Sequence, residues 1–90
     1  MMIVSQRGQI FNFDTAHSVE FKAENSGHYV AKINYWLPLE NPHLPGKQYL
    51  IEYTLGTFPT EEIADEVRAE LITAFNMHDG VYCIPEEAST

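Results

Sequence analysis

The chain of 90 residues contains one cysteine, Cys83, and therefore cannot form an internal disulfide bond. This cysteine usage is typical of proteins kept in a reducing compartment, so we expect a cytoplasmic location. Cys83 lies inside the apolar run 81–84, and that setting predicts a buried, unreactive thiol rather than a catalytic nucleophile.

Basic residues are scarce in this sequence. Five Lys and Arg residues stand against thirteen Asp and Glu residues, which gives a formal charge of -8. Proteins that bind nucleic acid neutralise its phosphates with Lys and Arg, and five such residues spread along the chain make no basic patch. The composition therefore argues against nucleic acid, and against an anionic membrane surface, as a partner.

Long apolar runs are missing too. The longest, residues 1–4 and 81–84, fall far short of the roughly 20 residues that a membrane-spanning helix needs. The sequence also lacks a charged start followed by an apolar stretch, which is the pattern of a secretion signal. A length of 90 residues suits one core, so we expect a single domain over residues 1–90 without membrane association.

Motifs that carry catalysis, cofactors or metals are absent. The five glycines form no phosphate-binding loop, and Ser5 lacks the Gly-x-Ser-x-Gly turn that exposes a nucleophile. None of the four histidines has a partner at metal-ligand spacing. We expect no enzyme, cofactor or metal. One alternative is a small ligand-binding domain or enzyme whose cleft is lined by histidines from distant strands: His17, His28, His43 and His78.

The first 56 residues alternate between apolar and polar positions, which predicts strands. Three runs alternate clearly, and shorter apolar segments at each end add further strands. The sequence predicts an α+β fold: an antiparallel β-sheet of about five strands, followed by one main α-helix and a short C-terminal strand. The expected strands are residues 2–5, 10–13, 18–23, 28–37, 48–55 and, at the end, 81–84.

A helix is predicted from about residue 60 to 77, where the apolar period changes from 2 to 3.6 and Thr60 is placed to cap the N-terminus. On its polar side three glutamates, Glu62, Glu66 and Glu70, repeat every four residues. Such a stripe is typical of a solvated face, and it also suits an acidic docking surface. The inward stripe and the sheet residues expected to meet it are Ile63, Val67, Leu71 and Phe75, and Ile33, Tyr35, Ile51 and Tyr53.

One helix cannot cover the predicted sheet. Five strands at about 4.8 Å spacing span roughly 24 Å, whereas a helix with its side chains is about 10 to 12 Å across. Val30, Trp36 and Leu50 lie on the opposite face and are predicted to form an exposed interaction surface. Either the sheet curls around its own core and the protein is a monomer, or a second copy covers this face or pairs along an edge strand; we favour a homodimer.

Two segments break the regular pattern. Residues 38–46 contain three prolines, which predict a stiff, exposed connection, and residues 42–45 fit the Pro-x-x-P pattern of peptide ligands. Residues 85–90 are predicted to form a frayed tail.

Short motifs lie at residues 3–6, 12–14, 55–58, 60–64 and 81–86. Together these segments resemble a group of short uncharacterised proteins of Gram-positive bacteria and their phages and mobile elements. The proline-rich segment 38–46 departs from that pattern, where a short turn is expected. The resemblance implies the layout of strands followed by a helix and implies no chemistry.

The missing catalytic motifs, the acidic helix and the strand-rich surface favour a non-enzymatic protein–protein interaction module. The sequence does not identify its protein partner. Besides the histidine-lined cleft, a second alternative is an acidic DNA-mimic or inhibitor protein of phage or mobile-element origin. For that alternative the charge of -8 is necessary but not sufficient.

Overall fold

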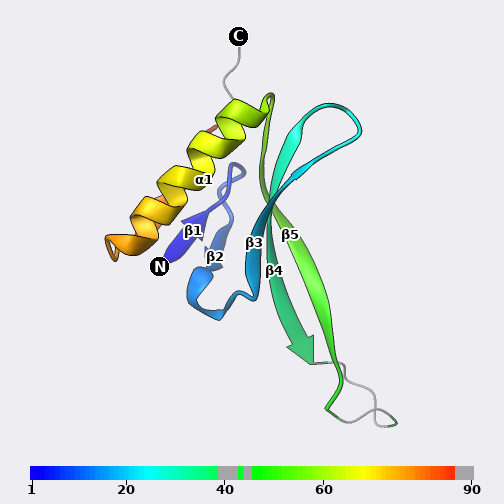
Figure 1. Cartoon of the computed structure of the whole chain (residues 1–90). Helices are drawn as coiled ribbons and strands as arrows, with labels where there is room; N and C mark the ends of the chain where they lie inside the picture. The colour runs from blue at the N-terminus through cyan, green and yellow to red at the C-terminus, as the bar shows by residue number, and fades with distance from the viewer. Residues whose placement is uncertain (39–42, 44–45, 87–90) are drawn as a thin grey trace.

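A computed structural model describes residues 1–38, 43 and 46–86 of the chain. The predicted α+β class, the antiparallel strands, the single helix and the short C-terminal strand are confirmed (Figure 1). The elements are β1 (Met2–Val4), β2 (Ile10–Asn12), the short 3-10 helix η1 (Phe13–Thr15), β3 (Ser18–Ala23), β4 (Tyr29–Pro38), β5 (Gln48–Phe58), α1 (Glu61–Asn76) and β6 (Val81–Cys83).

The strands form two sheets of three, so the prediction of one sheet of about five strands is wrong. The larger sheet has the order β3-β4-β5 and is antiparallel; the smaller has the order β2-β1-β6, with β1 and β6 parallel. The chain changes direction at η1, where the Asn12 side chain accepts a hydrogen bond from the backbone N–H of Asp14. This turn separates β2 from β3, so β2 pairs with β1 in the smaller sheet and β3 pairs with β4 in the larger one.

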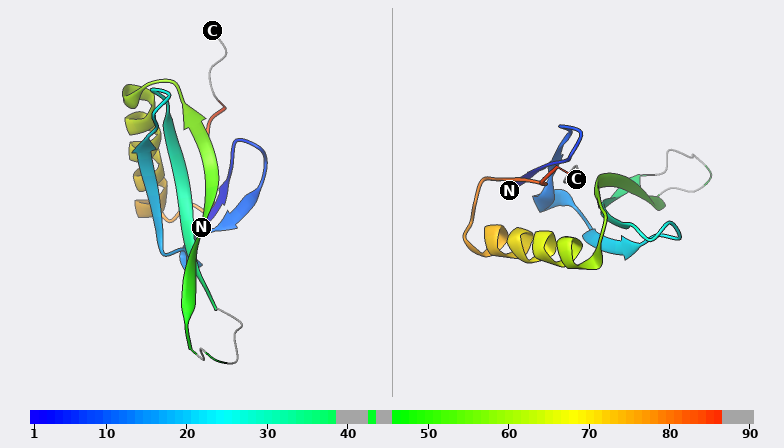
Figure 2. Two further views of the ribbon diagram at one scale, coloured as in Figure 1. Left: turned by 90° about the vertical axis from the view of Figure 1, so that its right-hand side faces the viewer. Right: turned by 90° about the horizontal axis from the view of Figure 1, so that it is seen from above.

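Both sheets and α1 enclose one hydrophobic core (Figure 2). The smaller sheet and α1 together cover the inner face of the larger sheet, where the width argument had offered a single sheet curled around its own core. The buried residues come from every layer: Ile3 and Ile84 from the smaller sheet and its end, Ala31, Ile33, Leu55 and Phe58 from the larger sheet, and Ala64, Val67 and Leu71 from α1.

The inward stripe of α1 differs in part from the prediction. Val67 and Leu71 are buried, but Phe75 is 51% exposed and Ala74 takes its place. A spacing of four residues drifts by about 40° per step around a helix, so a stripe of strict fours leaves the buried face within a few turns. The rings of Tyr35 and Tyr53 pack around Phe11 of β2, at 6.5 and 5.3 Å between ring centroids.

Gln6 joins the two sheets. Its backbone N–H donates to the Leu55 carbonyl at 2.8 Å, and its side-chain Oε1 accepts from the Thr57 N–H at 2.8 Å. Its Nε2 donates to the carbonyls of Thr57 and Pro85, at 3.0 and 2.9 Å. Gln6 therefore satisfies backbone groups on the outer edge of β5, as a neighbouring strand would. It does so at the bulge where β4 and β5 shift register between Ala31 and Lys32.

The far halves of β4 and β5 project beyond the core as a two-stranded arm (Figure 2). The predicted proline-rich connection, residues 38–46, lies outside the described residues apart from Pro38, His43 and Gly46. The same holds for residues 87–90 of the predicted tail.

Candidate functional site

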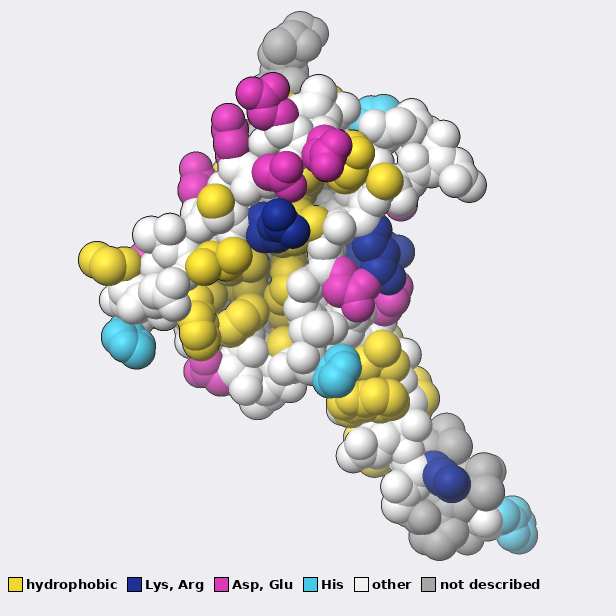
Figure 3. All heavy atoms as spheres, in the orientation of Figure 1, with side chains coloured by type: hydrophobic (Ala, Val, Ile, Leu, Met, Phe, Trp, Pro, Cys, Tyr) yellow, Lys and Arg dark blue, Asp and Glu magenta, His cyan; other side chains and the backbone are white. Residues whose placement is uncertain are grey.

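A groove runs between α1 and β3. It has a volume of about 510 Å³ and is lined mainly by apolar side chains. Figure 3 shows apolar side chains gathered in this hollow, below a basic side chain and a group of carboxylates. Residues 19–22 of β3 form one wall, Phe13 of η1 lies at the lower end, and α1 contributes Arg68, Leu71, Ile72 and Phe75.

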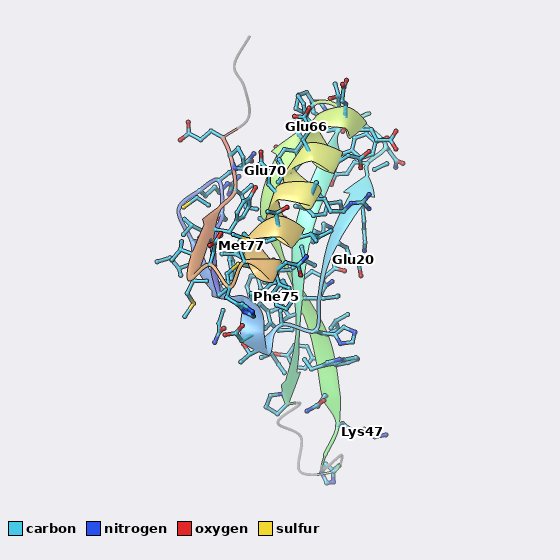
Figure 4. All side chains as sticks on the ribbon, turned by 60° about the vertical axis from the view of Figure 1, so that its left-hand side comes forward. Glu20, Lys47, Glu66, Glu70, Phe75 and Met77 are labelled. Carbon is cyan, nitrogen blue, oxygen red and sulfur yellow. The ribbon has the colours of Figure 1, made fainter. Side chains whose placement is uncertain are left out.

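Two large apolar side chains of α1 are exposed at the groove. Ile72 is 54% and Phe75 is 51% exposed, and the Phe75 ring packs edge-on against Phe13 at 5.4 Å between centroids. In Figure 4 Phe75 lies low on α1, next to η1, whereas Met77 lies toward the smaller sheet. A second hollow of about 320 Å³ continues the groove past Phe75 to Asp14 and His17.

β3 is an edge strand, and its outer side faces this groove. The N–H of Glu24 donates to the His28 carbonyl, which makes 24 and 28 a hydrogen-bonded pair. Hydrogen-bonded pairs alternate along an antiparallel ladder, so Lys22 and Glu20 also bond to β4. The backbone N–H and C=O groups of Val19 and Phe21 therefore point outward. No described residue donates to them or accepts from them.

The hydrogen bond from Thr57 to Gln6 supports this assignment independently. The Thr57 N–H points away from β4, so Thr57 and Val30 are not a hydrogen-bonded pair. Val30 must then direct its backbone groups toward Lys22 on β3, as the alternation requires.

The charged residues that line the groove are Glu20, Lys22 and Arg68, and the carboxylates of Glu61 and Asp65 lie beyond its upper end. Glu61 accepts a hydrogen bond from the Tyr29 hydroxyl at 3.4 Å, and Asp65 pairs with Arg68 at 3.6 Å. Burial and the nearby charge of Glu61 raise the pKa of Tyr29. The Tyr29 contact places the N-terminal end of α1 beside the C-terminal end of β3, because Tyr29 pairs with Ala23.

The predicted acidic stripe, Glu62, Glu66 and Glu70, is exposed on α1. Figure 4 shows Glu66 and Glu70 on the side of the helix toward the smaller sheet, away from Glu20 of β3. Glu70 accepts a hydrogen bond from the Tyr82 hydroxyl of β6 at 2.9 Å. Burial raises the pKa of Tyr82, and this hydrogen bond raises it further. The stripe and the groove are therefore on different sides of α1.

The outer face of the larger sheet carries the other predicted surface residues. Trp36 and Leu50 pair directly across β4 and β5 and are exposed, as the alternation predicts. The Trp36 ring meets His17 edge-on at 5.5 Å between centroids. Val30 was predicted to belong to this surface, but it is only 2% exposed. It lies in the central strand between Lys22 and Thr57, whose side chains flank it.

Between these residues the outer face is covered by charges. Lys22 pairs with Glu20 at 2.8 Å, and Glu52 lies 3.6 Å from Lys22 and 3.5 Å from Lys32. The hydrogen bond and negative charge of Glu20 raise the pKa of Lys22. Beneath them Asn34 is fully buried, and its amide nitrogen donates to Ser18 at 2.9 Å. This mutual pairing leaves little free charge on the outer face.

The titratable residues singled out from the sequence are scattered. His28 lies beside Ser26 in a turn, and His78 follows the C-cap residue of α1 in the left-handed conformation. Cys83 is exposed, which corrects the prediction of a buried thiol: β6 is an edge strand, and Val81 and Cys83 face outward. Among the described residues no three His, Cys, Asp or Glu side chains are placed to hold a metal ion.

No helix in the described part of the chain is long and apolar enough to cross a membrane. Comparison with known proteins gives no match, whether to a protein-family model, a curated protein or a solved structure.

Sequence reasoning missed the groove. The sequence feature that could have indicated the groove is the wide apolar face of α1, because Ile72 and Phe75 flank Leu71 on one side of the helix. The missing piece was which strand lies at the open edge of a sheet, since that depends on long-range pairing.

Proposed function

We propose that this domain is a non-enzymatic protein–protein interaction module that binds a segment of its partner in the groove between α1 and β3. The observation that carries the proposal is the open edge of β3, where no described residue pairs with the outward backbone groups of Val19 and Phe21, beside the groove of about 510 Å³. Volumes of this order are typical of binding sites.

The apolar wall of the groove supplies the driving force. Ile72 and Phe75 leave about half of their surface in water, and burying such a side chain fully contributes about 1.5 to 3 kcal/mol. The exposed aromatic and aliphatic residues lie together rather than singly, which is the arrangement found at interaction sites. Because about half of each side chain is already covered, a partner gains roughly half of this free energy per side chain, without any rearrangement of the core.

The two alternatives have less support. The carboxylates of the described residues are divided between α1, the outer sheet face and the turns, and Glu20 and Glu52 pair with lysines. A DNA mimic needs unpaired carboxylates spaced like phosphates. For a histidine-lined cleft, His17 borders the hollow beside Asp14, but the other described histidines lie elsewhere.

Affinity capture with matched variants tests the proposal. Ile72→Glu places a charge in the groove, and Met77→Glu makes the same change at a 71% exposed position of the same helix end. We expect proteins captured by the wild-type domain and by Met77→Glu to be lost with Ile72→Glu, while circular dichroism shows both variants folded. Equal capture by both variants would overturn the groove as the binding site.

A further inference from the structure

We infer that the occupant of the groove is an extended peptide that adds as an antiparallel strand to β3, with the pattern basic-x-apolar-x-apolar. This inference rests on the proposed function and specifies the partner's chemistry. It follows from three observations: the outward backbone groups of β3, the apolar wall of α1, and the carboxylates of Glu61 and Asp65 on α1 beyond the upper end of the groove.

The backbone requires an extended chain. Val19 and Phe21 each present one N–H and one C=O toward the groove, and their side chains face the core side, where Phe21 stacks on Phe58. Only a strand supplies donors and acceptors at the matching interval of two residues. Small apolar ligands would leave these four groups unpaired.

The register fixes which peptide residues are apolar. Residues directly opposite each other in an antiparallel pair point to the same face. The peptide residues opposite Phe21 and Val19 therefore point toward α1, where Leu71, Ile72 and Phe75 form the wall. The residue between them, opposite Glu20, points outward and is free to be polar.

The carboxylates at the N-terminal end of α1 determine the basic position of the peptide. An antiparallel strand begins at the end of β3 near Ala23, which lies beside the N-terminal end of α1 through the Tyr29–Glu61 hydrogen bond. Glu61 and Asp65 lie on the helix there, with Arg68 already paired to Asp65. A Lys or Arg two residues before the first apolar residue meets this acidic end, and the domain's charge of -8 favours its approach.

Alternate N-methylation of a peptide tests the inference. The probe is a fluorescein-labelled Lys-Thr-Val-Thr-Leu segment between glycine-serine flanks. Methylating the backbone nitrogens of Val and Leu removes the donors that face β3, whereas methylating those of the two Thr residues leaves them intact. Fluorescence polarisation should show binding to the unmodified peptide, about tenfold weaker binding after methylation of Val and Leu, and little change after methylation of the threonines.

Two further measurements sharpen the result. Replacing the peptide Lys by Glu should weaken binding at low salt, and this difference should shrink at high salt. Ile72→Glu should abolish binding, while Met77→Glu should retain it. Equal effects of the two methylated peptides, or no binding of any peptide, would overturn strand addition.

These outcomes separate the inference from the proposed function. If Ile72→Glu loses the captured partner while no peptide of this pattern binds, the groove remains the interaction site and the strand-addition inference is wrong. If Ile72→Glu changes neither capture nor peptide binding, both are wrong.

Discussion

At the scale of single residues, Gln6 and Gly56 are coupled. Gln6 forms its side-chain hydrogen bonds across the junction of the two sheets, and a Cβ atom at Gly56 would lie 2.6 Å from Gln6 Cδ. Gly56 is therefore required by close approach rather than by its backbone angles. The glutamine amide needs this space to reach β5.

We predict that Gln6→Ala lowers the free energy of unfolding by about 1 to 3 kcal/mol, because it removes the part-buried hydrogen bonds to the backbone N–H and C=O of Thr57 and the exposed one to the Pro85 carbonyl. Gly56→Ala should cost a similar amount by displacing the same side chain. In the double variant the clash is gone, so Gln6→Ala should cost almost nothing further. Urea unfolding of the four proteins measures this coupling, and simple additivity would contradict it.

Tyr82 makes the stability depend on alkaline pH. Burial and the hydrogen bond to Glu70 raise its pKa, so the folded state holds the phenolic proton more tightly than the unfolded chain. This contribution is complete below the unfolded pKa of about 10 and is lost as the pH rises above it. Urea unfolding at pH 8 and pH 11 should show lower stability at pH 11.

Tyr82→Phe should make this alkaline loss smaller. Burial also raises the pKa of Tyr35, so some of the loss should remain in the variant. An identical fall in stability for the wild type and Tyr82→Phe would show that Tyr82 does not contribute.

At the scale of elements, the sequence determines where the helix begins. The Thr60 side chain accepts a hydrogen bond from the Ile63 N–H at 3.2 Å, as expected of an N-cap residue. Thr60→Ala should therefore lower the free energy of unfolding by about 1 kcal/mol, while Thr60→Ser should retain most of it. Thermal unfolding of both variants measures the difference. Equal losses in the two variants would mean that the hydroxyl does not cap α1.

The strands were predictable one by one, but their partners were not. The alternating runs that became β3, β4 and β5 are local signals, and the β3–β4 hairpin follows from the turn at Asn25 to Gly27. The pairing of β1 with β6 joins segments about 80 residues apart, and no local pattern specifies it. The division into two sheets, and with it the open edge of β3, therefore could not be predicted from the sequence.

Burial was harder to predict than strand position for the same reason. Trp36 and Leu50 lie on the projecting arm and are exposed, whereas Val30, on the same face, is enclosed by its cross-strand neighbours. Alternation along a strand predicts which face of the sheet a side chain lies on, but it does not predict what covers that face. Likewise, the helix period places Phe75 near the core, but the crossing of α1 over the sheets leaves its ring at the groove.

At the scale of the whole molecule, the homodimer stays a prediction, and less exposed apolar surface now supports it. The second sheet and α1 cover the inner face, so self-association now depends on the exposed Trp36–Leu50 pair of the arm. We predict that light scattering at tens of micromolar gives a mass above the 10.3 kDa of one chain and that Trp36→Glu restores the monomer mass. A wild-type monomer at these concentrations would contradict the prediction.

Amide hydrogen exchange along β3 tests the open edge most directly. In the free domain we predict slow exchange at Glu20 and Lys22, whose N–H groups bond to β4, and fast exchange at Val19 and Phe21, whose N–H groups point into the groove. Adding a binding peptide should slow Val19 and Phe21 selectively. If these two amides are already protected in the free domain, the edge is closed and the groove cannot accept a strand.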